Sequence, residues 1–414
     1  MSAFSLSRGE LHAERVPLAT IAERFGTPCY VYSRAAIEAR YDAFDGAFAD
    51  LPHLVCYAVK ANSNLAILDL LARRGAGFDI VSAGELARVV AAGGDPAKTV
   101  FSGVGKADSE METALVAGIR CFNVESAAEL DLLNAVAGRV GKRAPISIRV
   151  NPDVDPRTHP YIATGLKESK FGVAYNDAPA LYRRAAGLAH VDVQGIDCHI
   201  GSQITDLAVY VEAARKMFAL VDAIESEGAA LRHIDLGGGL GIRYDDETTI
   251  DPAAYARAVR GLHGERSHEL LFEPGRFLVG EAGLLLTRVL YLKPGDTRDF
   301  AIVDAAMNDL LRPALYAAWH PVEPVRPRAG DARRWQIVGP VCESADFLAH
   351  DRGLVIAAGD LLAVRAAGAY GFAMSSNYNS RPRPCEVVVD GDRVHLARPR
   401  ERIADLFANE SMLR

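Results

Sequence analysis

Short apolar runs alternate with longer Ala-, Leu- and Arg-rich stretches through the first two thirds of the chain. The runs have the size and bounding residues of β-strands, and the stretches between them have the composition of helices. Eight strands with interposed helices over roughly 200 residues predict a (β/α)8 TIM barrel. The eight runs lie at residues 54–59, 77–82, 99–103, 119–124, 145–150, 191–200, 232–237 and 270–275.

The pattern changes after about residue 281, where apolar and β-branched runs such as "RWQIVGPV" are separated by Gly, Pro and Asp. Asp390 and Gly391, between two strand-like runs, predict a β-hairpin. We therefore expect a barrel domain at residues 33–280, followed by an all-β sandwich or barrel domain at residues 281–414. Residues 1–32 are assigned to the β domain, and whether they contribute strands to it is left open.

Composition narrows the classes of partner. Half of the 414 residues are hydrophobic, so the chain can bury the cores of two domains. Its 46 basic and 53 acidic residues give a net charge of -7, which argues against a nucleic-acid partner or an anionic membrane surface. No apolar run has the length of a signal peptide core or a membrane span. The six cysteines form no C-x-x-C pair, so we expect a cytoplasmic protein without a metal site, acting on a small molecule.

Several polar residues fall at the ends of the predicted strands, where TIM barrels carry their catalytic groups. Each alone is commonly structural: a lysine surfaces into water, a histidine is satisfied in the core, an arginine forms a rim salt bridge, and a glycine triplet makes a tight turn. Their convergence on one rim outweighs these separate readings. The set consists of Lys60, Asp79, Arg149, His199, Gly237, Gly238, Gly239, Glu273 and Arg276.

The glycine triplet indicates what this rim binds. The segment "GGGLG" lacks the G-x-G-x-x-G spacing of a dinucleotide loop, but it follows the seventh predicted strand, where barrels commonly bind phosphate. A lysine, a phosphate loop, an acid and an imidazole together suit pyridoxal 5'-phosphate. We assign Lys60 as the amine that binds the cofactor covalently, Glu273 as the partner of its ring nitrogen, and His199 as the group stacked on its face.

Longer motifs resemble those of bacterial diaminopimelate decarboxylases, members of the alanine-racemase-like, fold type III, class of pyridoxal-phosphate enzymes. The resemblance runs in order from about residue 27 to residue 385. It departs from the family at Ala345, often Gly, and at Ser169, often Asn, neither of them an expected catalytic group. The motifs are "YAVKANSN", "FDIVSAGE", "HPYIATGLKESKFG", "HIGSQ", "DLGGGLGI", "EPGR", "MNDLLRPALY", "CESADFLA" and "AGAYGFAMSSNYNSRPRP".

The resemblance implies decarboxylation of the D-configured centre of meso-2,6-diaminopimelate to give L-lysine and CO2, the last step of lysine biosynthesis. It implies that Cys342 donates the proton that replaces the lost carboxylate, with Lys60 and His199 as the other catalytic residues. It also implies a homodimer in which Cys342 serves the neighbouring subunit's site. The implied substrate-binding residues are Arg276, Arg312, Tyr316, Glu343 and Tyr370. The implied cofactor-binding residues are Lys60, Asp79, Arg149, His199, Ser202, Gly238, Gly239, Glu273, Gly275, Arg276 and Tyr370.

Two alternatives remain open. The same fold hosts decarboxylases of ornithine, arginine, lysine and carboxynorspermidine, but such substrates would leave Arg276 and Arg312 facing a cation instead of a second carboxylate. A catalytically silent regulatory homologue is the other alternative. Such a protein would be expected to lose the cofactor lysine or the proton donor, and this chain has both Lys60 and Cys342.

Overall fold

The computed structural model describes residues 3–155 and 170–413. The chain divides into two compact units, one formed by Arg40–Ile242 and Thr248–Phe277, the other by Met1–Ala39, Arg243–Glu247 and Leu278–Arg414. Among the described residues, no helix combines the length and the apolar character needed to cross a bilayer. The domain limits near residues 33 and 280 stay a prediction.

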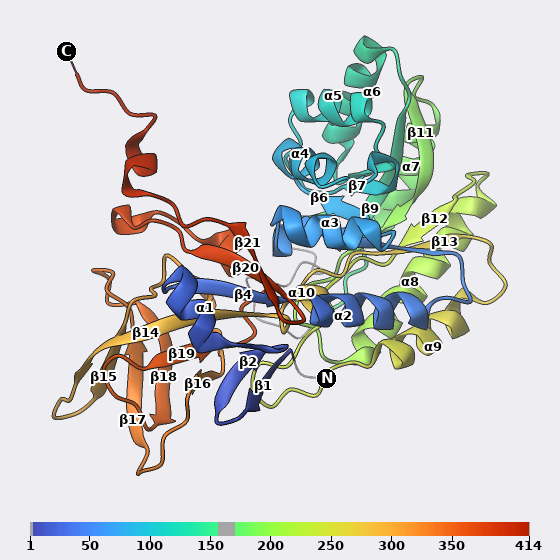
Figure 1. Cartoon of the computed structure of the whole chain (residues 1–414). Helices are drawn as coiled ribbons and strands as arrows, with labels where there is room; N and C mark the ends of the chain where they lie inside the picture. The colour runs from blue at the N-terminus through green and yellow to red at the C-terminus, as the bar shows by residue number, and fades with distance from the viewer. Residues whose placement is uncertain (1–2, 156–169, 414) are drawn as a thin grey trace. The chain divides into compact units, whose positions relative to one another are not determined.

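The first unit is built around a closed barrel of parallel strands (Figure 1). The strand order is β9-β11-β12-β13-β5-β6-β7-β8, and β8 pairs with β9 to close the ring. The predicted (β/α)8 barrel is therefore confirmed, and each predicted run overlaps one of its strands. These are β5 (His53–Ala58), β6 (Gly77–Ile80), β7 (Thr99–Phe101), β8 (Cys121–Val124), β9 (Ala144–Asn151), β11 (Val191–Asp197), β12 (His233–Asp235) and β13 (Glu269–Phe272).

The barrel strands are buried on both faces, and this explains their near-continuous apolar composition. Every residue of β6, β7, β8 and β12 is buried. Parallel strands covered by helices have no solvent face and so need no alternation of polar and apolar residues. A short strand, β10 (Val173–Ala174), pairs with the end of β9 outside the ring.

Helices connect the strands, and polar residues at the strand ends begin several of them. The side chains of Ser82 and Ser126 accept hydrogen bonds from the backbone N–H of Glu85 and Glu129, so each serine caps the helix that follows its strand. The helices are α2 (Arg34–Ala47), α3 (Leu65–Arg73), α4 (Ala83–Ala91), α5 (Asp108–Ala117), α6 (Ala127–Val140), α7 (Ala178–Ala186), α8 (Leu207–Ser226), α9 (Pro252–His263) and α10 (Arg276–Val279). Single 3-10 turns lie at η1 (Val59–Ala61), η2 (Pro96–Lys98) and η4 (Tyr175–Asp177).

The second unit is mainly β-structure. Its main sheet has the order β18-β17-β15-β14-β4-β20-β21, and β19 pairs with both β14 and β16. The strands are β4 (Cys29–Ser33), β14 (Gly283–Lys293), β15 (Asp299–Val303), β16 (Val322–Pro324), β17 (Arg333–Val338), β18 (Phe347–Leu354), β19 (Leu361–Val364), β20 (Cys385–Asp390) and β21 (Arg393–Arg398). Helices α1 (Leu18–Phe25) and α11 (Arg312–Tyr316) and turns η5 (Phe372–Met374), η6 (Tyr378–Ser380) and η7 (Ile403–Phe407) complete it.

The N-terminal segment belongs to this β unit. Strand β4 lies between β14 and β20, antiparallel to the first and parallel to the second. A separate small sheet is formed by β1 (Phe4–Ser7), β2 (Glu10–Ala13) and β3 (Val16–Pro17). Leu11 of this sheet is buried in one core with Val31 and Leu284. The question that the sequence left open is thus answered, because the N-terminal residues provide four strands of the β unit.

The predicted hairpin is also confirmed. Asp390 of β20 pairs with Arg393 of β21, so Gly391 and Asp392 form a two-residue turn. Gly391 has a φ of 63°, in the left-handed region that such turns require and that glycine adopts without strain.

Candidate active site

Lys60 lies at the carboxyl end of the first barrel strand. Strand β5 is buried from Val55 to Ala58, and the 3-10 turn η1 that follows carries Lys60 to the rim, where its side chain is 32% exposed. Its Nζ donates to Oδ2 of Asp79, which is completely buried at the end of the neighbouring strand β6. Among the described residues, no donor reaches the other oxygen of Asp79. The rim therefore holds one amine against one buried carboxylate.

Glu273 follows β13 and is buried in the barrel, 3% exposed. Ser102 Oγ and Asn123 Nδ2 each lie 3.4 Å from its Oε1, and His199 Nδ1 lies 3.9 Å from its Oε2. Burial raises the pKa of Glu273 well above its usual range, and the nearby carboxylates of Asp79, Asp235 and Asp197 raise it further. The Glu273 carboxyl can therefore keep a proton in these surroundings.

His199 is neutral in this environment. Burial lowers its pKa well below the usual value, and the cations of Arg149 and Lys60 lower it further. The backbone N–H of Gly238 donates to His199 Nδ1 at 3.2 Å, which requires an unprotonated nitrogen there. A neutral imidazole can lie against an aromatic ring without adding a charge to the site.

The glycine triplet lies where the ends of three strands approach one another. A Cβ on Gly237, Gly238 or Gly239 would come within 2.3, 2.0 or 2.2 Å of a backbone carbonyl oxygen, closer than atoms can approach. Gly237 and Gly239 also have φ values of 68° and 100°. Near this loop, Arg276 Nη2 donates to Ser202 Oγ at 3.0 Å. A Cβ on Gly275 would lie 3.0 Å from those of Ala58 and Ala61, the residues flanking Val59 and Lys60.

Arg149 connects this rim to the neighbouring strands. Its Nη1 donates to Glu125 Oε1 at 3.1 Å, and its Nε lies 4.0 Å from Asp197 Oδ2. Its guanidinium carbon lies 5.0 Å from the centre of the Phe171 ring. Arg149 is buried, so it places a fixed positive charge beside the carboxyl groups of the barrel interior.

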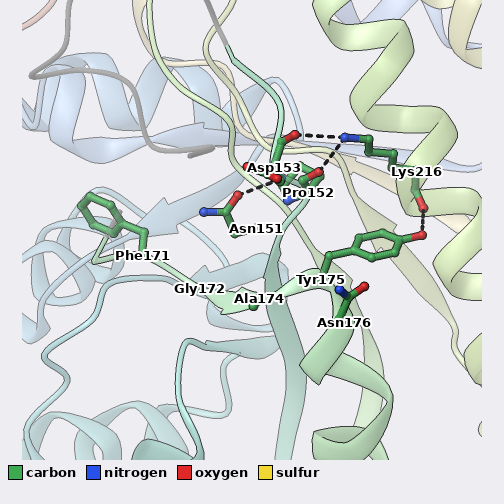
Figure 2. Close-up of a pocket in the computed structure, with 9 residues that line it drawn as sticks. All are labelled: Asn151, Pro152, Asp153, Phe171, Gly172, Ala174, Tyr175, Asn176 and Lys216. Carbon is green, nitrogen blue, oxygen red and sulfur yellow. Dashed lines mark hydrogen bonds between the residues drawn. The ribbon is translucent and has the colours of Figure 1, made fainter. Parts of the chain in front are cut away.

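Phe171 is one of the residues that line a cavity of about 290 Å³, shown in Figure 2. Lys216 Nζ donates to the backbone oxygens of Pro152 and Asp153, and the Tyr175 hydroxyl donates to the backbone oxygen of Lys216 (Figure 2). None of the predicted site residues lines it. Part of the motif "HPYIATGLKESKFG", including Ser169, lies outside the described residues.

The predicted residues of the β unit form two groups within it. Arg312 begins α11, is buried, and lies 3.0 Å from His320 Nε2 and 4.7 Å from the centre of the Tyr244 ring; Tyr316 ends the same helix. Cys342 and Glu343 lie in an exposed segment, where the Tyr378 hydroxyl donates to Glu343 and Asn379 Oδ1 accepts from the Cys342 backbone N–H. Tyr370 has a φ of 56° between β19 and η5.

The structure thus brings the predicted barrel residues together, whereas the roles of the β-unit residues stay a prediction. Residue patterns missed four neighbours of Glu273, namely Ser102, Asn123, Asp197 and Asp235. All four lie at or next to the carboxyl ends of their strands, so the signal that identified Lys60 also applied to them. They were overlooked because small polar residues are common at strand ends.

Comparison with known proteins identifies the family of the chain. Residues 34–280 match the family model described as "Pyridoxal-dependent decarboxylase, pyridoxal binding domain". Over its full length the chain is 61% identical to the full length of diaminopimelate decarboxylase from Pseudomonas aeruginosa. It is 57% identical to the Vibrio cholerae enzyme of the same name, covering 98% of this chain and 97% of the relative.

A solved structure extends the agreement to the fold. The crystal structure of diaminopimelate decarboxylase from Helicobacter pylori, complexed with L-lysine, matches with a TM-score of 0.92 and 41% identity. The match covers 95% of this chain and 99% of that chain. The chain therefore belongs to the pyridoxal-dependent decarboxylase family and, within it, to the diaminopimelate decarboxylases, the family that its motifs resemble.

Proposed function

We propose that the chain uses pyridoxal 5'-phosphate to decarboxylate meso-2,6-diaminopimelate to L-lysine and CO2. The observation that carries the proposal is the barrel rim, where a lysine, a buried glutamate, a neutral histidine and a glycine loop converge. These groups occur in a chain that is 61% identical to a diaminopimelate decarboxylase over its full length.

The residues of the rim fit the cofactor. The glycine loop packs without room for a Cβ at three successive positions, and we assign its backbone N–H groups, with Ser202 and Arg276 nearby, to the phosphate. Glu273 is a buried acid whose pKa is raised by burial, which suits a protonated ring nitrogen as its partner. We assign Lys60 as the covalent attachment point, and Asp79, Arg149, Gly275 and Tyr370 as further residues that hold the cofactor.

The chain's own residues then orient the reaction. When bound, the cofactor supplies an electron-accepting ring that takes up the electron pair left by the departing CO2. Glu273 would hold the ring nitrogen in its protonated form, and His199 would support one ring face as a neutral group. Because Glu273 is buried and the His199 side chain is only 16% exposed, both residues would limit the access of water to the ring.

Recognition of the far end of the substrate is assigned to the β unit and Arg276. A distal carboxylate is best bound by an arginine, whose planar fork donates two parallel hydrogen bonds. The contacts of Arg312 with His320 and Tyr244 support this role, because they fix the direction of its guanidinium. Tyr316 and Tyr370 would add hydroxyl groups, and Glu343 would pair with the distal ammonium.

Cys342 is proposed to return a proton to the substrate carbon, acting in the neighbouring subunit of a homodimer. The exposure of Cys342 and Glu343 supports this arrangement, because a segment at the surface of one chain can enter the site of another. We further propose that the enzyme works in the cytoplasm, consistent with six free cysteines.

The test is a substrate comparison with the purified full-length chain and added pyridoxal phosphate. Release of CO2 is measured with meso-diaminopimelate, ornithine, arginine, lysine and carboxynorspermidine at equal concentrations. We expect the highest kcat/KM for diaminopimelate, with L-lysine formed in equal amount to CO2. A higher kcat/KM for any of the other four would reassign the substrate.

A further inference from the structure

Three carboxyl groups crowd together inside the barrel, beneath the rim. Asp197, Asp235 and Glu273 each place an oxygen within 4.8 Å of the others, and all three are at least 97% buried. Asp197 and Asp235 end the adjacent strands β11 and β12, where they are directly paired in register. Only Glu273 has an assigned role, so the other two acids need an explanation.

Few donors reach this pair. The backbone N–H of Gly237 donates to Asp235 Oδ1 at 2.8 Å. Within the described part of the chain, Asp235 Oδ2 and both side-chain oxygens of Asp197 accept no hydrogen bond. Buried carboxylates normally accept several hydrogen bonds or pair with a cation, because otherwise the loss of hydration is uncompensated.

The neighbouring cations form ion pairs with other acids. Lys60 pairs with Asp79, Arg120 with Glu269, and Arg149 with Glu125 at 3.1 Å. Arg149 is closest to the pair, with its Nε 4.0 Å from Asp197. The thiols of Cys56, Cys121 and Cys198 and the imidazoles of His199 and His233 are neutral, because burial raises the pKa of each thiol and lowers the pKa of each imidazole.

A proton accounts for this arrangement better than a metal ion. Carboxylates at this separation in a low-dielectric interior repel too strongly for all three to ionise at once. A divalent cation between them would lie near the guanidinium of Arg149, which would repel it. A proton shared between the carboxyl groups avoids this repulsion, and it supplies a hydrogen-bond donor to the oxygens of Asp197 and Asp235.

We propose that Asp197 and Asp235 share one proton, and that this proton allows Glu273 to carry its negative charge toward the ring nitrogen of the cofactor. The second part rests on the proposed function. Asp197 and Asp235 are positioning residues, because they act through Glu273. If both were ionised, their charge would lie closer to Glu273 than to the ring and would draw the ring proton onto Glu273.

The titration of the pair agrees with this geometry. Burial and then the charge of Asp235 raise the pKa of Asp197 well above its usual range, although Arg149 opposes this. Burial raises the pKa of Asp235 to about 7, against the opposing hydrogen bond from Gly237. Asp79 of β6 and Glu125, which follows β8, add negative charge that also favours protonation of the pair.

Infrared spectroscopy of the full-length protein at pH 7 tests the shared proton. We expect Asp197→Asn and Asp235→Asn each to remove the same band, the C=O stretch of the carboxyl that carries the shared proton, because either substitution ends the sharing. Asp309→Asn is the matched control, since Asp309 is a buried acid of the β unit with a pKa raised by burial to about 7. Its own band should differ from the shared one.

Three results would overturn the shared proton. The first is that neither variant changes the band. The second is that each variant removes a separate band, which would indicate two independent protons. The third is that calcium or magnesium chloride raises the melting temperature of the wild type but not of both variants, which would indicate a cation site. These measurements need no substrate, so they stand even if the wild type forms no lysine and the proposed function fails.

The effect on Glu273 is read from the cofactor itself. With pyridoxal phosphate labelled with 15N in its ring, the chemical shift reports whether the ring nitrogen is protonated. On raising the pH, we expect the wild type and Asp309→Asn to lose this proton first, and both cluster variants to retain it to a pH at least about one unit higher. Equal midpoints in all four proteins would overturn the role of the pair.

Discussion

At the scale of single residues, the surroundings of Lys60 explain why its amine is available for chemistry. Asp79, its partner, is completely buried, whereas the Lys60 side chain is 32% exposed. The charge of the lysine is thus matched from inside the barrel, while its amine stays at the rim, where a small molecule can reach it. A surface lysine would lack this fixed position.

Arg312→Leu should weaken the use of diaminopimelate far more than the binding of cofactor. Loss of a charge-assisted contact in a desolvated site costs about 2 to 5 kcal/mol, or a roughly 30- to several-thousand-fold lower kcat/KM. Steady-state kinetics and a cofactor titration measure the two effects. Arg288→Leu is the control, because Arg288 donates to a backbone oxygen of Gly359 and should leave kcat/KM unchanged. An unchanged kcat/KM in Arg312→Leu would place Arg312 outside the substrate pocket.

Asp309 gives the β unit a pH-dependent stability. Its pKa is raised by burial to about 7, whereas an unfolded aspartate has a pKa near 4, so the folded chain holds a proton that the unfolded chain releases. The contribution of this proton to the free energy of unfolding is complete below about pH 4 and is lost as the pH rises to about 7. Asp309→Asn should flatten this fall in the free energy of unfolding by up to a few kcal/mol. The free energy of unfolding is measured by denaturant titrations at a series of pH values. If it fell with pH equally in the wild type and in Asp309→Asn, Asp309 would not cause the fall.

At the scale of elements, the site depends on how closely the strand ends of the barrel approach. Gly238 follows β12, and a Cβ there would lie 2.0 Å from the backbone oxygen of Glu273, just after β13. A substituent at this position must push the two strand ends apart. The distance between the loop assigned to the phosphate and the acid assigned to the ring nitrogen is therefore set by the contact at Gly238.

Gly238→Ala should weaken cofactor binding, because separating the strand ends moves Glu273 away from the glycine loop. Overpacking of this kind typically costs 1 to 3 kcal/mol, so we expect a roughly 5- to 150-fold higher Kd for pyridoxal phosphate in a fluorescence titration. Gly46→Ala is the matched control. A Cβ on Gly46 in α2 meets nothing within 4 Å, so the Kd of Gly46→Ala for pyridoxal phosphate should match that of the wild type. If Gly238→Ala bound pyridoxal phosphate with the wild-type Kd, the contact at Gly238 would not control the distance between the glycine loop and Glu273.

The barrel could be predicted from the sequence because its strands are buried on both faces and read as plain apolar runs. The strand β4, "CYVYS", is equally apolar, but its partners β14 and β20 lie about 250 or more residues further along the chain. No local pattern indicates such a partner. The contribution of the N-terminal segment to the β unit was therefore left open at the level of sequence.

The rim residues of the site were predicted, whereas the acids beneath them were missed, because a place at a strand end marks Asp197 and Asp235 but does not show that they face each other. Lys60, His199 and Glu273 have functional groups that barrel chemistry requires at strand ends. Asp197 ends β11, whose register shifts between Val193 and Gly195. Such an irregularity changes which side chains point inward, so alternation along the strand does not show that Asp197 faces Asp235.

At the scale of the whole molecule, the two ends of the chain belong to one unit. Strand β4 pairs with β14 and β20, so the first 39 residues fold with the last 137 around the same sheet. The barrel is thus inserted into the β unit along the sequence. Removal of either terminus should destabilise the β unit rather than shorten it harmlessly.

Mixing two inactive variants tests whether Cys342 serves a neighbouring subunit. If it does, Cys342→Ala and Lys60→Ala damage different halves of a composite site. A heterodimer then has one site with both lesions and one with neither. With half of the dimers mixed, activity should recover to about one quarter of the wild type by subunit counting.

The control mixture pairs Lys60→Ala with Glu273→Ala. Both residues lie in the barrel of the same chain, so each site of that heterodimer keeps one lesion and activity should not recover. Subunit exchange is confirmed by mass, and lysine formation is assayed. If Cys342→Ala and Lys60→Ala heterodimers form without recovery, Cys342 does not act across subunits.

The most direct test of the account is to map the lysine that carries the cofactor. The full-length chain is loaded with pyridoxal phosphate, reduced with borohydride, digested and analysed by mass spectrometry. The account predicts the cofactor on the peptide that contains Lys60, and no adduct in Lys60→Ala. An adduct on another lysine, such as Lys106, which is buried against Glu129 in the same barrel, would contradict it.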